Sequence, residues 1–218
     1  MSDKKGLIWE FLRKFVHLSS ILIVVVYTLF LNYFSEDFAI LALTALLLIL
    51  LEVEYFRLEH RSWLVDKIAP IFRKHEKDQV AGNVFLVISC IICFAAFEYW
   101  IAVVALFMTV FGDLFAALVG KAWGTTKMFK SKTYVGTLAG LAANLIVGIL
   151  ILPDFLYIVI PMAITASFVE TITNKLDDNL TVPLFAGFIG QLFIYYQVFY
   201  LGKENILPPI DFTFLGLF

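Results

Sequence analysis

Seven long apolar stretches constrain this chain more than any other feature of its sequence. They cover residues 16–34, 38–55, 80–97, 99–120, 134–153, 155–170 and 180–202. A helix needs about 20 mostly apolar residues to cross a bilayer, and backbone polar groups in lipid must be hydrogen-bonded within the structure. We therefore predict an all-α fold: a polytopic membrane helix bundle of about seven transmembrane helices, forming a single integral membrane domain over residues 1–218.

The composition excludes an ordinary soluble enzyme and a disordered chain. Hydrophobic residues make up 61% of the sequence and charged residues 16%. Soluble domains average about 45–50% and about 25%, and disordered chains are less apolar still. The solvent for most of this chain is therefore predicted to be lipid.

Lysine and arginine predict the orientation of the bundle. If the N-terminus is cytoplasmic, all but one of the 16 Lys and Arg residues fall on the cytoplasmic side, and only Lys203 falls outside. Cytoplasmic loops of membrane proteins carry such an excess of positive charge. We predict a multi-pass membrane protein whose active site faces the cytoplasm.

Asp113 is the most unusual polar residue because it lies inside the fourth apolar stretch. It precedes Gly120 by seven residues, so it lies roughly 10 Å from the cytosolic end of that helix. A carboxylate at such a depth costs about 2.5–3.5 kcal/mol unless it faces a cavity or a partner. We interpret Asp113 as part of a functional site; the alternative is a buried ion pair that fixes the register of the helices.

A stripe of small residues and a group of lysines surround Asp113 in the sequence. The stripe, with intervals of four, is Gly112, Ala116, Gly120 and Gly124. The stripe fits either close helix packing or the approach of a bulky anion to the backbone. Lys121 lies between its last two glycines, and after it come Lys127, Lys130, Lys132, Thr133, Gly136 and Gly140. Lysines and hydroxyls beside a helix N-terminus favour phosphate, although the nucleotide-binding pattern GxxxxGK[ST] is absent.

Carboxylates also gather near the sixth and seventh stretches. Glu170 lies near the end of one, and Asp177, Asp178 and Asn179 precede Pro183, which we expect to open the last span. The aspartates fit either a helix cap or a site for Mg²⁺, which binds one or two carboxylates together with substrate phosphates.

The N-terminal segment places four polar residues on one helical face before the first span: Glu10, Arg13, Lys14 and His17. One interpretation is a basic anchor for anionic lipid headgroups. The other is that His17, at the membrane border, takes or relays the proton of a hydroxyl group.

Four segments together resemble one family, the membrane kinases of lipid alcohols: dolichol kinase, phytol kinase and CTP-dependent diacylglycerol kinase. The segments are residues 10–17, 112–124, 132–140 and 170–183. Their order and spacing carry the resemblance. At Val135 the chain departs from the family pattern, which often has an acidic residue there.

The resemblance implies transfer of the γ-phosphate of CTP or another nucleoside triphosphate to the hydroxyl of a lipid alcohol, with Mg²⁺ as cofactor. The acceptor would be a polyprenol or dolichol, phytol, geranylgeraniol or diacylglycerol, and no nucleic acid is expected to bind. The implied catalytic residues are Asp113, His17 and Lys132. The implied nucleotide-binding residues are Arg13, Lys14, Gly112, Gly120, Lys121, Gly124, Lys132, Thr133, Gly136, Thr137 and Gly140. The implied metal ligands are Asp113, Glu170, Asp177 and Asp178, and the implied substrate residues are Asn179, Pro183 and Glu76.

Two other functions remain open at this point. A CTP-dependent cytidylyltransferase acting on a lipid phosphate has a similar region of small residues and lysines, but it also carries a longer C-terminal segment that this chain lacks. A small-solute transporter also suits an intramembrane aspartate and glycine-broken helices. Against a transporter, the polar residues crowd one face of the predicted bundle and no inverted repeat is apparent.

Overall fold

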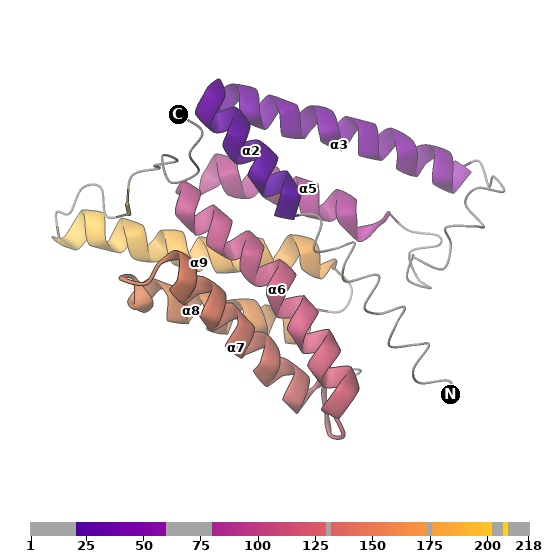
Figure 1. Cartoon of the computed structure of the whole chain (residues 1–218), viewed down its shortest axis with the longest axis vertical. Coiled ribbons are helices and arrows are strands. Elements are labelled where there is room, and N and C mark those ends of the chain that lie inside the picture. The colour runs from indigo at the N-terminus through magenta and orange to yellow at the C-terminus, as the bar shows by residue number, and fades with distance from the viewer. Residues whose placement is uncertain (1–20, 60–79, 130–131, 174–175, 202–206, 209–218) are drawn as a thin grey trace.

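A computed structural model describes residues 21–59, 80–129, 132–173, 176–201 and 207–208. Within these residues the chain forms seven helices: α2 (Ile21–Tyr33), α3 (Glu36–Glu59), α5 (Gly82–Ala96), α6 (Tyr99–Trp123), α7 (Tyr134–Ile151), α8 (Leu156–Ile172) and α9 (Asp178–Leu201) (Figure 1). Each predicted apolar stretch corresponds to one helix, so the all-α prediction is confirmed. The predicted site residues Arg13, Lys14, His17 and Glu76 lie outside the described residues.

Four of the described helices are long and apolar enough to cross a membrane: α3, α6, α7 and α9. The other three, α2, α5 and α8, are apolar but shorter, at 13, 15 and 17 residues. Large apolar side chains such as Leu48, Leu150 and Phe199 are exposed on the long helices. An apolar surface of this kind is stable in lipid and not in water.

Several helix ends differ by a few residues from the predicted bounds, and two of the differences have a clear cause. The second helix continues past residue 55 to Glu59, because the charges of Glu54 and Arg57 neutralise each other within it. The last helix begins at Asp178, so Pro183 lies inside α9 and does not open it.

A short β-hairpin connects α6 and α7, and the sequence analysis did not predict it. Strands β1 (Lys127–Phe129) and β2 (Lys132–Thr133) pair antiparallel. Tyr134 then begins α7 directly after β2, so the hairpin holds Lys132 at the N-terminus of that helix.

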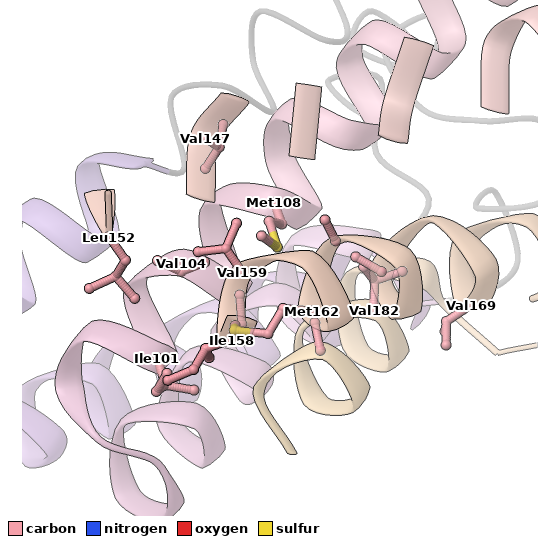
Figure 2. Packing of buried hydrophobic residues seen from close by; sticks show 14 of the residues in the cluster. Ile101, Val104, Met108, Val147, Leu152, Ile158, Val159, Met162, Val169 and Val182 are labelled. Carbon is pink, nitrogen blue, oxygen red and sulfur yellow. The ribbon is translucent and has the colours of Figure 1, made fainter. Parts of the chain in front are cut away.

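Helix α6 lies at the centre of the bundle. Ten of its residues are buried. Nine of these lie between residues 101 and 110, where Phe107 is half-buried. One apolar cluster joins α6 to α7, α8 and α9 through residues such as Met108, Val159 and Met162 (Figure 2). A second cluster joins α6 to α2, α3 and α5. Because α6 is apolar on all sides, both halves of the bundle can pack on it.

The helix order brings the lysine-bearing segments to one end of the bundle. The C-terminal ends of α3 and α6 and the beginnings of α5 and α9 lie toward the right of Figure 1. The hairpin with Lys127 and Lys132 lies at the same end of α6. We call this the lysine-rich end, and the end formed by the beginnings of α3 and α6 the opposite end.

Candidate functional site

The glycine stripe of α6 packs directly against α7. A Cβ atom built on Gly136 would lie 2.7 Å from the carbonyl oxygen of Ala116 and 3.0 Å from the Cα of Gly120. One built on Gly140 would lie 3.1 Å from the Cβ of Ala116. Of the two interpretations of the stripe, the structure shows close helix packing, and the two helices lie side by side in Figure 1. The stripe therefore sets the register between α6 and α7.

Lys132 and Glu170 form an ion pair at the lysine-rich end. The Nζ atom of Lys132 donates a hydrogen bond to Oε1 of Glu170 over 2.9 Å. The side chain of Glu170 is 7% exposed and that of Lys132 is 29% exposed. Strand β2 supplies the lysine and the last turn of α8 supplies the carboxylate. The buried carboxylate fixes the position of a cation that still reaches solvent.

The same cation lies beside the N-terminus of α7. Thr133 is the N-cap residue, and its hydroxyl accepts a hydrogen bond from the backbone N–H of Gly136 over 3.2 Å. Farther along, the hydroxyl of Thr137 lies 3.4 Å from that of Thr171 on α8. The helix N-terminus carries a partial positive charge of about half an elementary charge, so it adds to the field of the lysine. Glu170 offsets the charge of Lys132, so an anion here would bind to the remaining N–H donors of the ammonium group and to the partial charge of the helix N-terminus.

Polar contacts continue from this site into the interior of the bundle. Asn144 of α7 is fully buried, and its Nδ2 donates to the hydroxyl of Ser167 on α8 over 3.0 Å. Its Oδ1 has no hydrogen-bond partner among the described residues and lies against Gly112, the residue before Asp113. The sequence analysis missed Asn144, Ser167 and Thr171. A lone asparagine inside an apolar stretch was a signal that could have found the first of them.

Glu170 and the backbone of Gly112 approach the same part of the α6–α7 interface. A Cβ atom built on Gly140 would lie 3.2 Å from the carbonyl oxygen of Gly112 and 3.6 Å from Oε2 of Glu170. Asp113 follows Gly112 in α6 and is partly buried. Three helices thus bring polar groups to one place, although the residues are distant in the sequence.

The beginning of α9 uses its predicted site residues for helix capping and packing. Oδ1 of Asp177 accepts a hydrogen bond from the backbone N–H of Asn179 over 2.9 Å. The amide of Asn179 faces the carbonyl oxygen of Gly82 in α5, at 3.4 Å. Of the two interpretations of the aspartate pair, the structure shows the helix cap for Asp177. Pro183 is buried in α9.

The four predicted metal ligands do not form one cluster. Among the described residues, which include Asp113, Glu170, Asp177 and Asp178, no three His, Cys, Asp or Glu side chains are grouped so that they could hold a metal ion. The described residues therefore do not form a metal site made only of protein carboxylates. A site for Mg²⁺ that uses one or two carboxylates and the phosphates of a nucleotide does not need such a group.

A second ion pair, which the sequence analysis also missed, lies at the lysine-rich end of α3. Arg57 donates to both carboxylate oxygens of Glu54, with Nε 3.0 Å from Oε1. Oε2 of Glu54 also accepts from the backbone N–H of Ala81, over 3.2 Å. Both charged residues are buried. Opposite charges three residues apart on a helix were the available signal. The pair joins α3 to the start of α5, next to the contact between Gly82 and Asn179.

The remaining predicted nucleotide-binding residues lie at the end of α6. Lys121 is exposed in its last turn, and Gly124 follows the helix and contacts the side chain of Thr133. The structure thus places Lys121, Gly124, Lys132 and Thr133 around the junction of α6, the hairpin and α7. Comparison with family models, curated proteins and solved structures gives no match.

Proposed function

We propose that this protein is a membrane kinase that transfers the γ-phosphate of CTP, or of another nucleoside triphosphate, to the hydroxyl of a lipid alcohol. We also propose that all seven helices span the membrane with the N-terminus and the lysine-rich end in the cytoplasm. The observation that carries the proposal is the Lys132–Glu170 pair at the capped N-terminus of α7. It is a fixed cation beside a helix N-terminus, at the end where an intramembrane aspartate also lies.

Lys132 is suited to neutralising phosphate charge in the transition state. An ammonium group has three N–H donors, and the contact with Glu170 uses one of them. The remaining donors reach solvent because the side chain is 29% exposed. Phosphoryl transfer depends mainly on positioning and on electrostatic stabilisation. In this proposal Glu170 is a positioning residue for Lys132, and not a metal ligand.

Mg²⁺ fits this chain as an ion shared between one or two carboxylates and the nucleotide. When bound, it would neutralise the developing charge on the phosphates. Asp113 is the proposed protein ligand, because it is a partly buried carboxylate that follows Gly112, whose carbonyl oxygen lies at the interface that Glu170 also reaches. Asp178, in the first turn of α9, is the proposed second ligand. His17, which lies outside the described residues, is the proposed acceptor of the hydroxyl proton.

The lipid chain of the acceptor would lie along the apolar exterior of the same helices. Leu138 on α7 and Phe168 on α8 are 64% and 62% exposed, and Phe168 is two residues from Glu170. A hydrophobic chain held there would bring its hydroxyl group to the border where the nucleotide phosphates bind. A kinase of lipid alcohols needs this meeting of a lipid-facing surface and a phosphate site, since its two substrates prefer different solvents.

The test uses the purified full chain in lipid nanodiscs with Mg²⁺ and CTP labelled on the γ-phosphate. Diacylglycerol, farnesol, geranylgeraniol, phytol and a long polyprenol are offered as acceptors, with ATP in parallel. We expect the label to move into one lipid and CDP to be released. Asp113→Asn should lower turnover by about 100-fold or more, as the loss of a transition-state contact does. Asp154→Asn, which makes the same change at the opposite end, should leave turnover unchanged.

Three results would contradict the proposal. Release of pyrophosphate with a lipid phosphate as acceptor would identify a cytidylyltransferase. Solute uptake that requires no nucleotide would identify a transporter. Full activity of the Asp113→Asn variant would remove this aspartate from the site even if the kinase reaction were observed.

A further inference from the structure

A polar cavity lies at the opposite end of the bundle, away from the proposed kinase site. Its volume is about 280 Å³, and it lies between the end of α2, the beginning of α3, the junction of α5 and α6, and α9. The residues that matter for its chemistry are Tyr27, Glu36, Phe94, Glu98, Tyr99 and Gln191. The proposed function does not use any of them.

The charge of the cavity is negative. Glu36 lies in the first turn of α3 and Glu98 at the N-cap of α6, where the side chain makes no capping hydrogen bond; both residues are exposed and lie at the rim of the cavity. Neither carboxylate has an ion-pair partner within the part of the chain that the structure describes. Each adjacent helix N-terminus offsets about half an elementary charge, so two carboxylates leave the cavity net negative. A cation is therefore the ligand that it favours.

Two buried polar side chains line the cavity with groups that lack a partner. Tyr27 is 2% exposed, and its hydroxyl makes no hydrogen bond to any described residue. Gln191 is 5% exposed; its Oε1 accepts from the backbone N–H of Glu98 over 2.8 Å, while its amide N–H₂ has no partner in the described chain. Neither atom belongs to the fully buried polar atoms that lack a partner among the described residues, so both are accessible from the cavity and can bond to a ligand there.

Aromatic rings form one wall of the cavity. The rings of Tyr27 and Phe94 are stacked, with their centroids 3.7 Å apart, and Tyr99 lies 6.0 Å from Phe94. The hydroxyl of Tyr99 is hydrogen-bonded to Thr28 over 2.8 Å, which fixes its ring. Aromatic rings attract organic ammonium ions through their electron-rich faces. A divalent metal ion instead prefers six or more oxygen ligands, and the described residues offer no group of three metal-binding side chains.

We propose that this cavity binds a small organic ammonium ion, either as a free amine such as choline or ethanolamine or as the headgroup of a zwitterionic lipid. The two carboxylates supply charge, the half-buried ring of Tyr99 supplies cation–π contact, and Tyr27 and Gln191 supply hydrogen bonds to an oxygen close to the ammonium group. The inference is independent of the kinase reaction, because it concerns other residues at the other end of the bundle.

The test measures binding of radiolabelled choline to the full chain in nanodiscs of phosphatidylglycerol, with ethanolamine as a competitor. Saturable binding is expected. The double variant Glu36→Gln/Glu98→Gln should bind choline about three- to tenfold more weakly, since each partly solvated charge contact contributes about 0.2–1 kcal/mol. The matched control is Asp37→Asn/Asp154→Asn, which removes two exposed carboxylates that do not line the cavity. It should change the Kd less than twofold.

Several outcomes would overturn the proposal. They are the absence of saturable choline and ethanolamine binding, an equal loss in the control variant, and displacement of choline by Ca²⁺ beyond the effect of NaCl at equal ionic strength. Phosphatidylcholine or phosphatidylethanolamine added to the nanodiscs distinguishes the two sources of the ligand. If the apparent Kd for choline rises with the fraction of that lipid, the lipid headgroup occupies the cavity; if it stays constant, the ligand is the free amine.

Discussion

The Lys132–Glu170 pair predicts an asymmetry between two substitutions that each remove one charge. Lys132→Met leaves the carboxylate of Glu170, whose side chain is 7% exposed, without its cation. Removal of one partner of a buried pair lowers stability by about 3–5 kcal/mol, and we expect about 3 kcal/mol because the partner is partly hydrated. Glu170→Gln instead leaves a lysine that is 29% exposed and can turn toward water. Its expected effect is about 1 kcal/mol, the net value of one hydrogen bond.

The assay is the free energy of unfolding in detergent, measured by titration with SDS and followed by circular dichroism. The double variant Lys132→Met/Glu170→Gln contains no buried charge at this place, so it should recover most of the stability that Lys132→Met loses. Lys127→Met is the matched control: this exposed lysine lies in the partner strand of the hairpin, and its loss should change stability by less than about 0.5 kcal/mol. The reasoning is refuted if Glu170→Gln destabilises the protein as much as Lys132→Met, or if the double variant is less stable than both.

Two further predictions concern the packing and the orientation of the bundle. Gly136→Val should lower the free energy of unfolding by about 1–3 kcal/mol, because even its Cβ would lie 2.7 Å from the carbonyl oxygen of Ala116. Ala142→Leu on the exposed face of α7 should change it little, and equal losses would contradict the proposed packing. The orientation can be tested in sealed vesicles of known orientation with a maleimide that does not cross the membrane. The maleimide should react with Asp154→Cys from the extracellular face of the membrane and with Lys127→Cys only from the cytoplasmic face. The reverse pattern would show that the predicted orientation is wrong.

Much of the fold could be predicted from local sequence. Runs of apolar residues predict helices in lipid wherever they occur, because each helix satisfies its own backbone hydrogen bonds. All seven predicted stretches therefore appear as helices among the described residues. The predicted end at residue 55 and the expectation that Pro183 opens the last span were wrong, because a charged pair within a helix and a proline after its first turn are both tolerated. The β-hairpin was missed because its two strands are too short to show a pattern.

The candidate site could be predicted only in part. The sequence identified Lys132, Glu170 and Asp113 as unusual, since charges near or inside apolar stretches are costly. It could not show that Glu170 binds Lys132, that Asp177 caps a helix, or that Asn144 meets Ser167.

The sequence by itself indicated a membrane as the medium of this protein and predicted the positions of its helices and the orientation of its charges, because these depend on the composition of contiguous segments. The tertiary structure alone decided which polar groups meet. The Lys132–Glu170 contact joins residues 38 positions apart, and the contact of Glu98 with Gln191 joins residues 93 positions apart. Such contacts depend on the register of one helix against another. That register is set by close packing, as at Gly136 and Ala116, which no single segment of the sequence contains.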